Sequence, residues 1–139
     1  MSELGLIHHR VEGEVEYFLA LVAMPLPQLA DFPQDKVEPF RDVYRTFSEA
    51  DAQWVKDKER ITNHDVKAVE YFVKEAMEQL GVGAWKEFVH FGLTSQDVNN
   101  TAVPLSLKRA TEQVVLPLLD ETIADVARLA VEWKEVPML

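Results

Sequence analysis

The sequence contains no cysteine, only five glycines and no long apolar run. Without cysteine, the chain has no disulfides, cysteine metal ligands or thiol nucleophiles, and the cytosol is the compartment we expect for it. No stretch reaches the roughly 18 consecutive apolar residues of a membrane-spanning helix, so no membrane span is expected. The first ten residues also lack the apolar segment of a signal peptide.

Positive charge is scarce, with 14 basic against 24 acidic residues and a net charge of −10. A negative field of this size repels nucleic acid and anionic lipid, so neither is an expected partner. A small anionic ligand would need local hydrogen-bond donors that override the field of the whole chain.

Apolar residues recur at intervals of three or four, which predicts an all-α protein. The first predicted helix spans residues 4–22 and stops before two prolines, Pro25 and Pro27, which cannot continue it. Its polar face is expected to carry the intervening charges, Arg10, Glu12, Glu14 and Glu16.

Three more helices are predicted before residue 94. One spans about residues 36–46, and the next runs to about residue 60 after an N-cap at Ser48 with Asp51 three residues later. The third follows Asn63 and ends near Gly81.

From Thr94 onward a long helical pattern runs to about residue 135, and Pro104 and Pro117 are expected to bend or split it. Its apolar stripe is wide enough to need several covering helices. We therefore expect residues 1–93 to form an N-terminal helical domain. Residues 94–139 are expected to form the first long helix of a bundle domain, in a chain truncated from a longer one.

Two polar patches lie where a loop becomes a helix, at residues 62–65 and 94–97. A helix N-terminus offers unpaired N–H groups and partial positive charge, so a carboxylate or phosphate can bind there. The hydroxyls of Thr62, Thr94 and Ser95 add donors. A neutral His64 at such a terminus can donate one hydrogen bond and still accept a proton.

Each patch also has a purely structural interpretation. Asn63 and Thr94 are favoured N-cap residues, and Thr94 with Asp97 approximates a capping box. Taken alone, either patch is more often a simple helix start. His8, His9 and His90 are weaker candidates, His90 being a possible packed histidine. No metal-ligand spacing, phosphate loop or nucleophile elbow is present, so no metal or cofactor is expected.

Together, the two patches resemble the adenylosuccinate lyase family. Residues 59–72 are similar to the family's segment around its Asn-His-Asp motif, and residues 87–100 to its Thr-Ser motif, with a matching separation. Thr94, Ser95 and Asp97 alone would indicate only the wider fumarase/aspartase superfamily. The string from Thr62 to Glu70 is much more specific, and the similarity extends from Ser2 to Leu139.

This resemblance implies a lyase of purine biosynthesis that cleaves adenylosuccinate, or the succinyl imidazole-carboxamide nucleotide, to release fumarate. The other product of adenylosuccinate is AMP. It also implies an all-α homotetramer whose long helices form a central bundle and whose active sites combine several subunits. By motif, the substrate-binding positions are Asn63, His64, Asp65, Thr94 and Ser95, with Thr94 and Ser95 on a succinyl carboxylate.

The family's catalytic base is a serine on a mobile loop, and its acid is a histidine in a Thr-His-Gly segment. Neither segment occurs in this sequence, so we predict no catalytic residue in this chain and no activity for the chain alone. Two alternatives remain open. Another lyase of the superfamily could share Thr94 and Ser95, or a non-enzymatic helical module could self-associate through the stripe after Val115. The module leaves the string of residues 63–70 unexplained.

Overall fold

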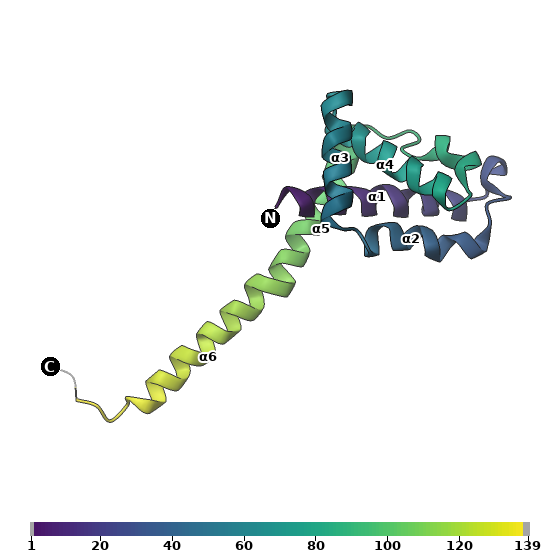
Figure 1. The fold of residues 1–139 in the computed structure, drawn as a ribbon. Coiled ribbons are helices and arrows are strands. Elements are labelled where there is room, and N and C mark those ends of the chain that lie inside the picture. Colours follow the sequence, from purple (N-terminus) through teal and green to yellow (C-terminus); the bar gives the residue numbers. More distant parts are fainter. Residues whose placement is uncertain (1, 138–139) are drawn as a thin grey trace. The chain divides into compact units, whose positions relative to one another are not determined.

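The computed structural model describes residues 2–137, and within that range it contains helices and no strand (Figure 1). The prediction of an all-α protein is confirmed. The chain divides into two compact units, Met1–Ser106 and Leu107–Leu139. The domain boundary expected at residue 94 stays a prediction.

Helix α1 (Glu3–Ala23) is the central element of the first unit. Its N-terminus is capped by Ser2, whose Oγ accepts a hydrogen bond from the N–H of Gly5 at 3.2 Å. It ends just before Pro25, as predicted. Around it pack α2 (Val37–Arg45), α3 (Glu49–Thr62) and α4 (Asp65–Gln79). Fully buried core side chains include Val11, Val15, Phe18, Phe40, Val55, Val69, Val73 and Met77.

Two residues, Asn63 and His64, separate α3 from α4. The predicted capping box opens α3, because Ser48 and Asp51 each accept a hydrogen bond from the other's backbone N–H. The helix runs through Thr62, and Asn63 then takes the left-handed conformation with φ of 51°. Asparagine tolerates this conformation better than most residues. The chain can therefore turn at Asn63 and start α4 immediately, with His64 as the N-cap.

Short 3₁₀ segments connect the main helices. Two lie between α1 and α2, at η1 (Pro27–Leu29) and η2 (Gln34–Lys36), and a third, η3 (Gly83–Phe88), follows α4. After η3, His90 and Gly92 both adopt positive φ values, of 62° and 72°. These two left-handed residues turn the chain into α5 (Ser95–Ala110).

The two prolines expected to interrupt the long helix behave differently. Helix α5 passes through Pro104, whereas the π-helical segment η4 (Thr111–Val115) precedes α6 (Leu116–Glu132), which has Pro117 in its first turn. A proline ring crowds the carbonyl four residues earlier and supplies no N–H. Widening the preceding turn into a π-helix is a common way to accommodate such a disruption.

In the second unit, α6 exposes many large apolar side chains. They include Leu116, Leu118, Leu119, Ile123, Val126, Val131 and Trp133. Among the described residues, no helix is both long and apolar enough to be a candidate membrane span.

One expectation about α1 is wrong. Its charges were expected on a polar face, but Arg10 and Glu12 are each 8% exposed and Glu14 is fully buried. The reason is that α1 lies among the other helices of this unit. Its charged side chains therefore contact protein instead of water. Charges buried in this way must be paired, and the partners of Arg10 and Glu14 lie in the candidate site.

Candidate functional site

The two polar patches meet in the structure. His64 caps the N-terminus of α4, Ser95 is the first residue of α5, and the Ser95 Oγ lies 3.2 Å from the His64 Nε2. These two residues are 31 apart in sequence, and the N-termini of their helices open next to each other. This is the proximity that the sequence interpretation required.

The hydrogen bonds at His64 determine where its proton lies. The N–H of Lys67 donates to the His64 Nδ1 at 3.1 Å, so Nδ1 carries no proton. The neutral ring then carries its proton on Nε2, which donates to the Ser95 Oγ. Because the Ser95 oxygen already accepts this bond, the Ser95 O–H is left to donate to a ligand.

Thr94 serves mainly as a cap in this structure. Its N–H and its Oγ1–H both donate to the Asp97 carboxylate, each at 2.7 Å. The hydroxyl bond from Thr94, and then its backbone bond, lower the pKa of Asp97. One half of the predicted capping box is thus present, the bond from the Thr94 N–H to the Asp97 carboxylate. The Thr94 hydroxyl proton is also used by Asp97.

Asn63 and Thr62 line the start of α4. The Asn63 N–H bonds to the Glu59 carbonyl at 2.8 Å and closes α3, while its side chain is exposed. The Thr62 Oγ1–H lies 3.1 Å from the carbonyl oxygen of His64. Asn63 is therefore required first by the backbone turn.

Asp65 is held by two donors. Its Oδ1 accepts from the N–H of Val66 at 2.8 Å, and its Oδ2 forms an ion pair with the Arg10 Nη2 at 2.8 Å. Partial burial raises the pKa of Asp65, but the Val66 bond and the Arg10 charge outweigh it and the net pKa is lowered. Asp65 is therefore ionised at neutral pH and fastened to α1.

Arg10 links the two helix openings, and the sequence interpretation missed it. In addition to the Asp65 pair, its Nε donates to the Asn99 Oδ1 in the first turns of α5 at 2.9 Å. One planar guanidinium thus contacts the starts of both α4 and α5. Its side chain is only 9% exposed. An unpaired arginine could not remain so buried.

Two further polar side chains of α1 hold the segment that leads into α5. The fully buried Glu14 pairs with the His90 Nδ1, and the Tyr17 hydroxyl donates to the Phe91 carbonyl at 2.8 Å. Burial raises the pKa of Glu14, and the contacts with His90 only partly oppose this effect. Arg10, Glu14 and Tyr17 are four and three residues apart, so they share one face of α1.

Most of the specific string in α4 has a structural explanation. Glu70 is 5% exposed, and its carboxylate oxygens lie 2.7 Å from the Lys67 Nζ and 3.0 Å from the Lys74 Nζ. Burial raises the pKa of Glu70, but the effect of the two lysines is larger and in the opposite direction. The pKa of Glu70 is therefore lowered. Val66, Ala68 and Val69 are buried.

The arrangement provides donors for an anion. In α4 the N–H groups of Val66 and Lys67 are already bonded to Asp65 and His64, so the backbone donors for an anion are those at the start of α5. Both helix dipoles present partial positive charge. The Ser95 hydroxyl adds a directed donor, and the His64 side chain is 49% exposed. A carboxylate approaching from solvent can therefore reach Ser95 without displacing a protein contact.

Comparison with known proteins places the chain in a family. A family model described as lyase matches residues 6–139, and the chain belongs to this lyase family. It is 47% identical over 143 residues to an adenylosuccinate lyase of Dictyostelium discoideum. It is also 42% identical over 144 residues to that of Vibrio cholerae and 40% identical over 140 residues to that of Escherichia coli K12.

These alignments cover 99% of this chain but only 31% of each relative. The chain therefore spans about a third of the length of the curated relatives it matches. Asn63, His64, Asp65, Thr94 and Ser95 lie within or next to the paired helix openings, and their role in binding substrate stays a prediction.

Proposed function

We propose that this chain is part of an adenylosuccinate lyase, which cleaves adenylosuccinate to AMP and fumarate, and that its paired helix openings bind the succinyl part of the substrate. The succinyl imidazole-carboxamide nucleotide carries the same group and would bind in the same way. The observation that carries the proposal is the contact between His64 and Ser95 at the adjoining N-termini of α4 and α5.

The reaction is a β-elimination. A base removes a proton from the succinyl carbon, the electron pair forms the double bond of fumarate, and the C–N bond breaks as an acid protonates the departing nitrogen. Negative charge builds up on the succinyl carboxylate next to the carbanion. Donors fixed before the reaction stabilise that charge without having to reorganise.

His64 and Ser95 fit the stabilising part of this chemistry. The His64 Nε2–H donates to the Ser95 Oγ and orients the hydroxyl, whose proton is then directed at the carboxylate. The adjacent N–H groups of α5 contribute the helix dipole. In this proposal His64 orients Ser95 and substrate, Asn63 and Thr94 shape the two openings, and Asp65 secures α4 through Arg10.

The acid and base are proposed to come from segments outside these 139 residues, as in the family that the sequence resembles. The exposed apolar face of α6 supports assembly with further copies, because such a face needs covering helices. We propose a homotetramer, with the cytosol as its compartment.

Titration of the 139-residue chain with fumarate and succinate, followed by amide chemical shifts, tests the site. We expect saturable shifts at Ser95, Gln96 and Lys67, and their loss in Ser95→Ala. Ser48→Ala is the matched control because it removes the N-cap of α3, a helix start outside the proposed site. Shifts that persist in Ser95→Ala, or that are lost equally in Ser48→Ala, would count against the proposal.

A further inference from the structure

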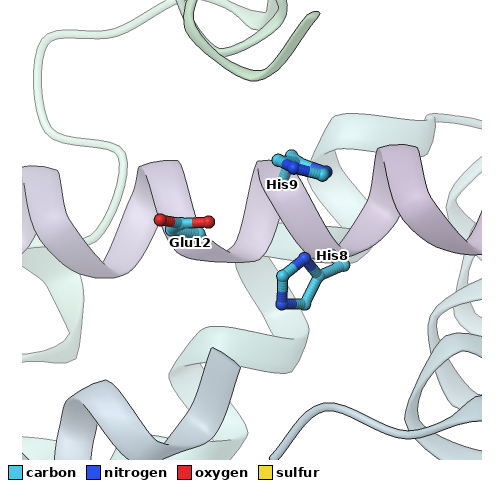
Figure 2. Close-up of side chains that lie close together, drawn as sticks. All are labelled: His8, His9 and Glu12. Atoms are coloured by element: carbon cyan, nitrogen blue, oxygen red, sulfur yellow. The ribbon is translucent and has the colours of Figure 1, made fainter. Parts of the chain in front are cut away.

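A second cluster of ligand-type side chains lies on α1, formed by His8, His9 and Glu12. One potential ligand atom from each residue lies within 4.8 Å of the other two. Figure 2 shows the three side chains along the same stretch of helix. We propose that this cluster binds a divalent transition metal ion of the zinc class.

The hydrogen bonds of His9 leave one nitrogen available for a metal. The His9 Nδ1 lies 2.6 Å from the carbonyl oxygen of Gly5. A carbonyl only accepts, so Nδ1 carries the ring proton and Nε2 presents its lone pair. That Nε2 is buried and has no hydrogen-bond partner among residues 2–137. A buried acceptor without a partner is unfavourable, and metal coordination would satisfy it.

His8 is arranged in a complementary way. Its Nε2 lies 2.9 Å from the carbonyl oxygen of Tyr44, so Nε2 carries the proton and Nδ1 is the free acceptor. Metal-ligating histidines nearly always donate their second ring N–H to a carbonyl or carboxylate, which fixes the tautomer and orients the ring. Both imidazoles show this arrangement, each with one ring nitrogen on a backbone carbonyl oxygen.

Glu12 completes the set with an anionic oxygen. It lies four residues after His8 and three after His9, the spacings that bring side chains together on a helix. Glu12 is 8% exposed. The net charge of −10 also attracts cations.

The donor atoms determine the class of metal. Two imidazole nitrogens and one carboxylate oxygen suit Zn²⁺ and similar ions, whereas Mg²⁺ and Ca²⁺ prefer oxygen alone. Ligand atoms around a tetrahedral zinc lie about 3.3 Å apart, and the three candidate atoms lie within 4.8 Å of one another. A fourth position would remain for water. Binding would fix α1 to the C-terminal end of α2 through His8 and Tyr44.

Calorimetric titration of the chelator-treated chain with ZnCl₂ at pH 7.5 tests this site. We expect saturable one-to-one binding, and a rise in thermal midpoint because the ion binds the folded state. His9→Gln should weaken binding at least about tenfold, since a direct ligand should matter no less than its supporting groups. His64→Gln and His90→Gln, which remove the chain's other two imidazoles, should leave binding unchanged.

A spectroscopic readout keeps the test decisive if a variant fails to fold. In the unmodified chain, Zn²⁺ should shift the ¹⁵N resonances of the His9 Nε2 and the His8 Nδ1, and MgCl₂ should not. Because protons compete with the metal for its ligands, binding should weaken as the pH falls. Absence of saturable binding, or binding that survives His9→Gln but is lost in His64→Gln or His90→Gln, would overturn the proposal.

Discussion

The guanidinium of Arg10 lies 2.8 Å from the carboxylate of Asp65 and is the point at which α1 fastens the candidate site. The same group reaches Asn99 at 2.9 Å, so the openings of α4 and α5 share one buried anchor. The separation of His64 from Ser95 is thereby set by a residue far from both in sequence. This long-range contact explains why the starts of α4 and α5 lie next to each other.

Replacing Arg10 with methionine should destabilise the chain by about 2–4 kcal/mol, because it removes a buried charged partner from Asp65 and Asn99. It should also disturb the contact between His64 and Ser95. Urea denaturation measures the first effect, and the ¹⁵N resonances of His64 report the second.

Arg60→Met is the matched control for Arg10→Met. Arg60 is 76% exposed and pairs only with Asp57 among the described residues. Its replacement should change stability by no more than about 0.5 kcal/mol. Equal losses in the two variants would contradict the anchoring role of Arg10.

In a full-length lyase that contains this chain, His64→Ala should lower the turnover of adenylosuccinate about 10²-fold or more, because it removes the group that orients Ser95. His64→Asn separates this role from capping, since asparagine caps helices well. We expect His64→Asn to remain impaired while it retains the stability of α4. Wild-type turnover in either variant would reduce His64 to a helix cap.

Glu14 and Glu16 should give opposite pH dependences of stability. Burial raises the folded-state pKa of Glu14 above its ordinary 4.5, so its ionisation destabilises the fold as the pH rises above that value. In Glu16 the Arg41 hydrogen bond, the largest effect, lowers the pKa, so its stabilisation is present above pH 4.5 and is lost as the pH falls.

Glu14→Gln should therefore gain stability relative to the unmodified chain between pH 4.5 and pH 7, by about 1.4 kcal/mol for each unit by which the pKa was raised. Glu16→Gln should instead lose relative stability as the pH rises toward 4.5, the interval in which Glu16 ionises in the folded state. Thermal denaturation at several pH values measures both. The same sign in the two variants would refute this assignment.

The exposed face of α6 should drive self-association. Ile123→Lys places a charge on an apolar position that is 58% exposed, so any copy packed on it must bury that charge. We expect a shift toward smaller species in analytical ultracentrifugation. Thr122→Lys adds the same charge without removing an apolar side chain and should shift the distribution less. An unchanged distribution in Ile123→Lys would place the contact elsewhere.

Local signals in the sequence predicted the helices well. Pro25 marks the end of α1, and Ser48 with Asp51 marks the start of α3, because caps and breakers act within a few residues. The meeting of His64 and Ser95 could be predicted only through the resemblance to a family. Nothing local to either residue specifies the other.

The buried charges of α1 were beyond prediction from pattern alone. Periodicity assigns Arg10 and Glu14 to a polar face of the helix. It does not show whether that face contacts water or buried charged groups of other helices. Their partners Asp65 and His90 are 55 and 76 residues away in sequence. The available signal was a run of charges within a strongly apolar helix.

The half-exposed side chain of His64 has a kinetic consequence. A dicarboxylate held at these helix openings keeps water on its outer side, where the high dielectric limits a single charge contact to about 1 kcal/mol. A ligand bound by these residues alone should therefore dissociate quickly and exchange rapidly with bulk solution. Long residence, and the dry surroundings that strengthen charge stabilisation, would have to come from whatever covers this surface.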